Sequence, residues 1–207
     1  MGKKVNMTQI FDEKGVVHPV TVIETGPMVV TQVKTVAKDG YNAIVVGFGE
    51  RAEKNINKAQ IGQMGGAKYM TLREFRFDAD PSTDSGQGPT YKVGDSIDLS
   101  TFSAGDNISV SSISKGIGFQ GGVKRYGFKG GPRSHGQKHS EREPGSLGGG
   151  GRDGGRVAKG KRMAGRMGGD NITLKGLTLV DLDTKTGEMY IRGAVPGRRG
   201  TLVEING

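Results

Sequence analysis

One glycine-rich, basic segment limits most strongly what this chain can fold into. Residues 114–168 hold 18 Gly, 13 Lys and Arg and three acids in 55 residues, a formal charge of +10. The whole chain carries +9, so the other 152 residues sum to −1. The few apolar residues of the segment follow no period of two or 3.6 that would build a core. We therefore expect this segment, named here the basic arm, to be disordered when alone.

A polyanion would supply the free energy that the basic arm lacks. Ordering the backbone of one residue costs about 1–2 kcal/mol, and each phosphate neutralised by Lys or Arg releases condensed counterions. Glycines also allow backbone N–H groups to approach phosphates closely. We interpret the arm as a segment that becomes ordered on structured nucleic acid. The alternative is a solvated, flexible basic linker, since runs of charge are usually solvated.

Composition narrows the class of protein further. The 207 residues contain no Cys, which excludes a disulfide scaffold and Cys-based zinc sites and fits a reducing compartment. A pI near 9.8 favours an anionic partner, nucleic acid first and an anionic membrane surface second. No apolar stretch approaches the length of a membrane span, and the first residues lack the apolar run of a signal peptide. We expect neither a membrane span nor a leader.

Outside the arm, apolar and polar residues alternate between frequent turns. The pattern predicts one short surface helix within residues 50–70, ended by Gly65 and Gly66. Many short strands with almost no helix predict a mainly β protein, a small closed or nearly closed β-barrel. This barrel domain comprises residues 1–113 and 169–207, with 114–168 as a long irregular extension. The strands are expected at residues 5–11, 16–24, 28–34, 41–47, 72–77, 96–99, 107–113, 171–183, 188–195 and 201–205.

Two motifs in the arm have enzymatic or metal-binding interpretations. Residues 116–121 match G-x-G-x-x-G, but a dinucleotide site needs a helix after the third glycine. The glycines between there and Pro132 predict that no helix forms. His135 and His139 would share a face only on a helix, which Gly136 disfavours. Because no nucleophile lies beside a paired base either, we expect no enzyme activity, no cofactor and no metal.

Cations and aromatic residues alternate in residues 124–129, a pattern that suits phosphate pairing and base stacking on RNA. The alternative is that Tyr126 and Phe128 pack on the rim of the barrel. Residues 159–166 form a second basic cluster, typical of phosphate contacts. His135 and His139 are more consistent with donors to phosphate or 2′-OH than with metal ligands.

Several motifs resemble the bacterial form of the uL3 family, the universal large-subunit ribosomal protein three. In the arm these are residues 114–136, 144–148 and 159–168, and outside it 2–11, 39–44, 73–76 and 192–197. Two positions depart from the family pattern. Asn6 stands where the family usually has Gly, which indicates an altered first turn. Residues 148–155 lack the Gln that some members carry methylated, so that modification is not carried over.

The resemblance implies a six-stranded Greek-key barrel of the translation-protein type and a structural role in the large subunit of a cytoplasmic ribosome. It implies direct binding of 23S rRNA near its 3′ end, early in assembly, and an extension that reaches toward the peptidyl-transferase centre. The implied neighbours are ribosomal proteins L-fourteen and L-nineteen, without membrane contact or homo-oligomer. A free RNA chaperone is the alternative, and an enzyme using G-x-G-x-x-G a more distant one.

The candidate rRNA-binding residues come from the matching family motifs and from the other cations and the aromatic–basic run of the arm. They are Lys115, Lys124, Arg125, Tyr126, Lys129, Arg133, His135, Lys138, His139, Arg142, Arg152, Arg156, Lys159, Lys161, Arg162 and Arg166.

Overall fold

The computed structural model describes residues 1–77, 91–148 and 154–207. The chain divides into two compact units. One unit, the β domain, comprises Met1–Ser112 and Thr173–Gly207, and the other, the extension, comprises Ile113–Ile172. Strands outnumber helices, so the prediction of a mainly β protein is confirmed.

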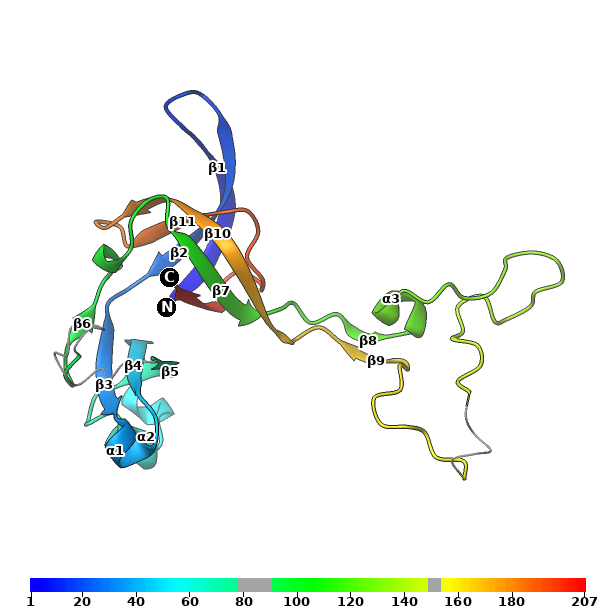
Figure 1. Cartoon of the computed structure of the whole chain (residues 1–207), viewed down its shortest axis with the longest axis horizontal. Coiled ribbons are helices and arrows are strands. Elements are labelled where there is room, and N and C mark those ends of the chain that lie inside the picture. The colour runs from blue at the N-terminus through cyan, green and yellow to red at the C-terminus, as the bar shows by residue number, and fades with distance from the viewer. Residues whose placement is uncertain (78–90, 149–153) are drawn as a thin grey trace. The chain divides into compact units, whose positions relative to one another are not determined.

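Six strands of the β domain form a closed barrel in the order β1-β12-β7-β10-β11-β2. Figure 1 labels β1, β2, β7, β10 and β11. The neighbouring strands run antiparallel where their register is defined. Strands from both ends of the sequence are therefore needed to close it. The six are β1 (Gly2–Phe11), β2 (Val17–Thr25), β7 (Asn107–Ile113), β10 (Asn171–Asp183), β11 (Glu188–Arg192) and β12 (Leu202–Asn206).

Alternate side chains are buried along β7, β11 and β12. In β7, Ile108 and Val110 are buried while Ser109 between them is partly exposed, which is the period of two of a half-buried strand. The register shifts between Lys4 and Asn6, so β1 contains a bulge there. Asn6 therefore lies within a strand rather than in the expected altered turn. The core comprises Ile23, Ile108, Val110, Leu179, Met189, Ile191, Val195, Val203 and Ile205.

A separate sheet holds the four remaining strands of the β domain, in the order β5-β4-β3-β6. The sequence prediction placed these strands in the barrel as well, and this part of the prediction is wrong. The central strand β4 is buried at six successive positions, so both of its faces are covered. The strands are β3 (Met28–Lys34), β4 (Ala43–Glu50), β5 (Tyr69–Arg76) and β6 (Ser96–Ile97).

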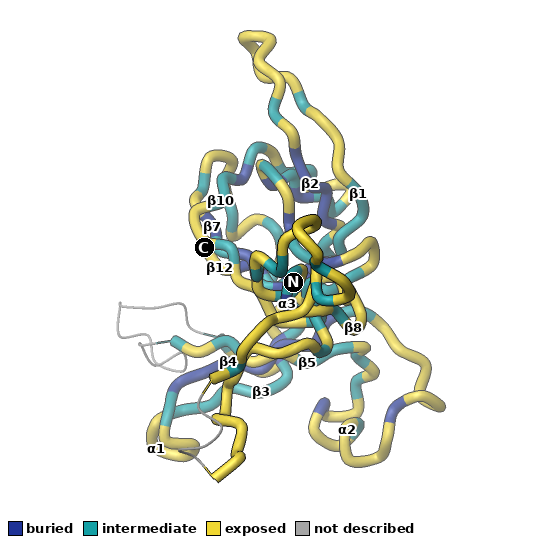
Figure 2. The backbone as a smooth tube through the Cα atoms, turned by 90° about the vertical axis from the view of Figure 1, so that its right-hand side faces the viewer, coloured by how far each residue is buried: buried dark blue, intermediate teal, exposed yellow. Residues whose placement is uncertain are grey.

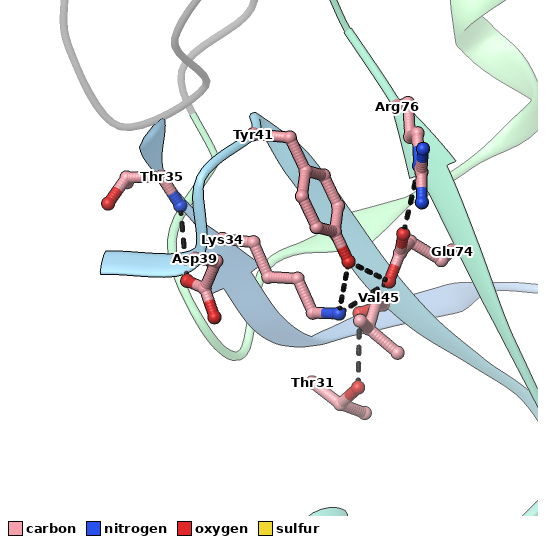
Figure 3. A network of polar contacts seen from close by, with 8 residues as sticks. All are labelled: Thr31, Lys34, Thr35, Asp39, Tyr41, Val45, Glu74 and Arg76. Carbon is pink, nitrogen blue, oxygen red and sulfur yellow. Dashed lines mark hydrogen bonds and ion pairs between the residues drawn. The ribbon is translucent and has the colours of Figure 1, made fainter. Parts of the chain in front are cut away.

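One carboxylate and two cations fix the edge of this sheet (Figure 3). The ammonium of Lys34 donates to Oε2 of Glu74 at 2.6 Å and to the Tyr41 hydroxyl at 2.8 Å. Arg76 lies with its guanidinium 4.3 Å from the centre of the Tyr41 ring and donates to Glu74 at 3.3 Å. Chiefly because Lys34 donates to it, the pKa of Glu74 is lowered. These contacts connect β3, β5 and the turn before β4, so the network is structural.

Helices are short and lie between strands. The predicted helix within 50–70 is present as α2 (Lys58–Gln63), preceded by a 3-10 turn, η1 (Glu53–Asn55). The side chain of Asn57 accepts the Gln60 N–H at 2.7 Å and caps α2. A further helix is α1 (Val36–Asp39), and η2 (Leu99–Thr101) follows β6. Within the described ranges, no helix is long and apolar enough to span a bilayer.

Candidate nucleic-acid interface

A two-stranded ribbon joins the two ends of the extension. Strand β8 (Gly118–Gln120) pairs antiparallel with β9 (Gly165–Met167), as Figure 1 shows. Next to the ribbon, the Ile117 N–H donates to the Met167 carbonyl at 2.9 Å. Gly168 has φ +77°, and a Cβ there would lie 2.2 Å from the Lys115 carbonyl oxygen. Only glycine fits where these two parts of the chain pass each other.

A one-turn helix, α3 (Gly122–Tyr126), follows β8 directly. The sequence prediction that no helix forms after Gly121 is therefore wrong. The glycines lie at the ends of the helix, where they are favoured, because Gly127 has φ +72° and ends it. Residues 118–120 form a strand and α3 has five residues. The described residues thus do not form the glycine loop and long helix that dinucleotide binding needs.

Arg125 connects α3 to the segment that precedes β9. Its Nη1 donates to the Met163 carbonyl at 2.7 Å, and a Cβ at Gly165 would lie 2.7 Å from the same nitrogen. The guanidinium lies 4.9 Å from the centre of the Tyr126 ring, and that of Arg162 lies 5.8 Å from it. Arg125 is partly buried, so its first role is to hold two distant segments together.

The Tyr126 and Phe128 rings pack against each other, with centres 5.9 Å apart. Phe128 also lies over α3, because a Cβ at Gly122 would be 2.9 Å from its ring. These two rings therefore contact each other and α3, all within the extension. Arg125, Arg162 and Phe128 all adjoin the Tyr126 ring, and Tyr126 is only 36% exposed.

A tight loop brings Gly130 and Gly131 beside Glu141. The Gly131 N–H donates to the Glu141 carbonyl at 2.8 Å, and Arg133 pairs with the Glu141 carboxylate at 2.7 Å. His135 has φ +61°, the left-handed region, so the segment from His135 onward is a turn and not a helix. No group of three or more His, Cys, Asp or Glu suited to a metal occurs among the residues described.

Most candidate residues are exposed; Figure 2 colours exposed residues yellow along the chain. Of the sixteen, fourteen are exposed, Arg125 is partly buried, and Arg152 lies outside the described residues. The described part of the extension contains twelve Lys and Arg residues. Among these, only Arg133 forms an ion pair. The other eleven have no carboxylate partner in the described structure. That these residues contact RNA stays a prediction.

Phe119 was missed by the sequence analysis. Its side chain is 76% exposed, the most exposed of the large apolar side chains described. It lies opposite Arg166 in the β8–β9 ribbon. The sequence carries no signal that separates it from a core residue, because Ile117 lies two positions before it and Val123 four positions after it.

Known proteins similar to this chain are ribosomal. The sequence model of the family described as Ribosomal protein L3 matches residues 92–194. The chain is 45% identical over 207 residues to large ribosomal subunit protein uL3 of Roseiflexus sp. (strain RS-1), covering 99% of this chain and 94% of the relative. The uL3 protein of Nostoc punctiforme is 46% identical over 206 residues (99% and 94%), and that of Heliobacterium modesticaldum 44% over 204 residues (98% and 93%).

The chain is mainly β, has a cationic extension and is similar to large-subunit ribosomal proteins. It is therefore a structural protein of the translation apparatus and not an enzyme. More specifically, the chain belongs to the uL3 family of large-subunit ribosomal proteins. Both the family expected from the motifs and the expected non-enzymatic role are thereby confirmed.

Proposed function

We propose that this chain is a structural component of the large subunit of a cytoplasmic, bacterial-type ribosome and binds 23S rRNA directly through its extension. One observation carries the proposal. Residues 113–172 hold 13 Lys and Arg and four acids, a charge of +9, whereas the other residues hold 17 of each sign and are neutral. Nearly all of the described cations in the extension are exposed without an ion-pair partner. Such a surface gains free energy by releasing counterions from phosphates.

The middle of the extension has little support from its own contacts. Between Gly131 and Lys159, few backbone hydrogen bonds and few buried side chains occur in the described residues. Free energy from RNA contacts must then replace that of a core. We propose that the extension enters folded 23S rRNA near its 3′ end and reaches toward the peptidyl-transferase centre. Binding there would occur early in subunit assembly.

We further propose that the barrel is a Greek key of the translation-protein type. The order β12-β7-β10-β11 supports this. Among the barrel strands, β7, β10 and β11 follow one another in the chain, and the later strand β12 lies beside β7, as in a Greek key. In the particle, the neighbours would be ribosomal proteins L-fourteen and L-nineteen. The chain would act as a single copy without membrane contact.

Sedimentation of the tagged protein in cell extracts tests the main proposal. We expect it to sediment with the large subunit and to remain there after washes at high salt. A free RNA chaperone would dissociate steeply with salt, with a slope of about −0.7 to −0.9 per phosphate contact. Recovery of the protein only in the unbound fraction would refute the proposal.

A further inference from the structure

The Phe119 ring lies uncovered in a part of the chain that is otherwise locally ordered. It belongs to β8, and the backbone of Gly118–Gln120 pairs with β9. Phe119 is 76% exposed, so its ring is open to solvent, although the ribbon holds the backbone that carries it. A fixed aromatic ring with open faces is suited to stacking.

Phe119 and Arg166 share one face of the ribbon. They are direct antiparallel partners, and opposed residues of such a pair project to the same side of a sheet. On the other face, Gln120 is opposed by Gly165, which has no side chain. The ribbon thus presents one aromatic ring and one guanidinium together on a single face.

The surroundings of this face favour RNA over a protein partner. Residues 107–140 contain no Asp or Glu. Lys115 and Lys124 flank β8 in the sequence, and both are exposed without an ion-pair partner in the described structure. A mainly cationic surround repels a basic protein and attracts phosphate. Aromatic rings between cations are the usual means of holding unpaired bases.

We propose that Phe119 stacks on an unpaired base of rRNA while Arg166 contacts an adjoining phosphate. This inference rests on the proposed function, in that the ligand is the same RNA. It assigns the stacking role to Phe119 in place of Tyr126, which adjoins Arg125, Arg162 and Phe128 and has less free ring surface. The ribbon is then a base-binding site at the start of the extension.

A single-tryptophan experiment tests the stacking directly. The chain contains no Trp, so Phe119→Trp creates one fluorescent reporter. Stacking on a base quenches indole fluorescence, and we expect strong quenching on addition of a 23S rRNA transcript. The matched control is Phe11→Trp, because Phe11 is 61% exposed but lies in β1 of the barrel. Equal quenching of both variants, or of neither, would overturn the inference.

Affinity for the same transcript gives an independent measurement. Loss of one base–aromatic stack corresponds to roughly 5- to 150-fold weaker binding. We expect that loss for Phe119→Ala, most of it for Phe119→Leu, and little for Phe119→Tyr. Because the ring is exposed, thermal unfolding of these variants should match that of the wild type.

The outcomes separate this inference from the proposed function. If the wild type binds the transcript and Phe119→Ala binds equally well, the stacking is refuted while the proposed function stands. If the wild type fails to bind 23S rRNA, the proposed function itself fails. If Phe119→Ala retains its affinity for RNA but is lost from the large subunit, the ring contacts a protein and the stacking inference is wrong.

Discussion

Removing two lysines of the extension should weaken rRNA binding by an amount that the structure allows to be calculated. Lys124 and Lys129 are exposed and lack ion-pair partners in the described structure. Arg125, between them, is different, because it donates to the Met163 carbonyl and contacts Tyr126. The double variant Lys124→Ala/Lys129→Ala should therefore remove two proposed phosphate contacts without loosening the fold of the extension.

The magnitude follows from counterion release. Each contact contributes about 0.7–0.9 to the slope of log K against log salt. At about 0.15 M salt, this corresponds to roughly 4- to 5.5-fold per contact, relative to 1 M salt. The double variant should then bind about 15- to 30-fold more weakly, a loss of about 1.6–2 kcal/mol. Its salt slope should become shallower by about 1.4–1.8.

Filter binding of a 23S rRNA transcript across a salt series measures both quantities. The matched control is Lys38→Ala/Lys58→Ala, which removes the same charge from exposed positions of the β domain. We expect the control to leave the slope nearly unchanged. A control that loses as much slope as the extension variant would show that binding senses only total charge. An unchanged affinity of the extension variant would remove both lysines from the contact set.

Three further substitutions test the structural part of the interpretation. Gly168→Ala should open the ribbon, because its Cβ would lie 2.2 Å from the Lys115 carbonyl oxygen, and hydrogen exchange of the Ile117 amide should become faster. The control is Gly160→Ala, because Gly160 also has a positive φ, +82°, but lies in open space. Equal effects of the two substitutions would contradict the reasoning. Leu179→Ala, at a fully buried barrel position, should cost about 2–5 kcal/mol in urea unfolding, and a cost below about 1 kcal/mol would contradict its place in the core. Glu74→Gln should lower stability by up to about 1 kcal/mol at neutral pH. The lowered pKa of Glu74 means that this contribution exists above the unfolded-state pKa and is lost as pH falls through the folded-state value. Melting curves should therefore converge in acid, and an equal difference at both pH values would refute the ion-pair explanation.

Strands with clear alternation could be predicted from the sequence to the residue. The prediction for residues 107–113 has the bounds of β7, and 171–183 those of β10. Alternation fixes where a strand lies and which face is buried, but not which strand it pairs with. For this reason the sequence did not separate the sheet of β3, β4, β5 and β6 from the barrel.

The candidate site was predictable in charge but not in geometry. Lys124 and Arg125 are both cations in the sequence, yet only the fold shows that Arg125 contacts Met163 and Tyr126. Gly121 and Gly127 are typical helix breakers, and their positions at the two ends of α3 depend on contacts such as that of Phe128 with Gly122. Phe119 could not be separated from a core residue, because exposure is a property of the folded chain.

Amide hydrogen exchange, measured on the free protein and on the large subunit, tests most directly whether RNA orders the extension. In the described structure, backbone hydrogen bonds of the extension gather at residues 114–131 and 165–170, with few between. We predict fast exchange for residues 132–148 and 154–162 in the free protein and strong protection of the same amides in the subunit. Slow exchange of these amides in the free protein would contradict the interpretation, because the extension would then hold its shape without RNA.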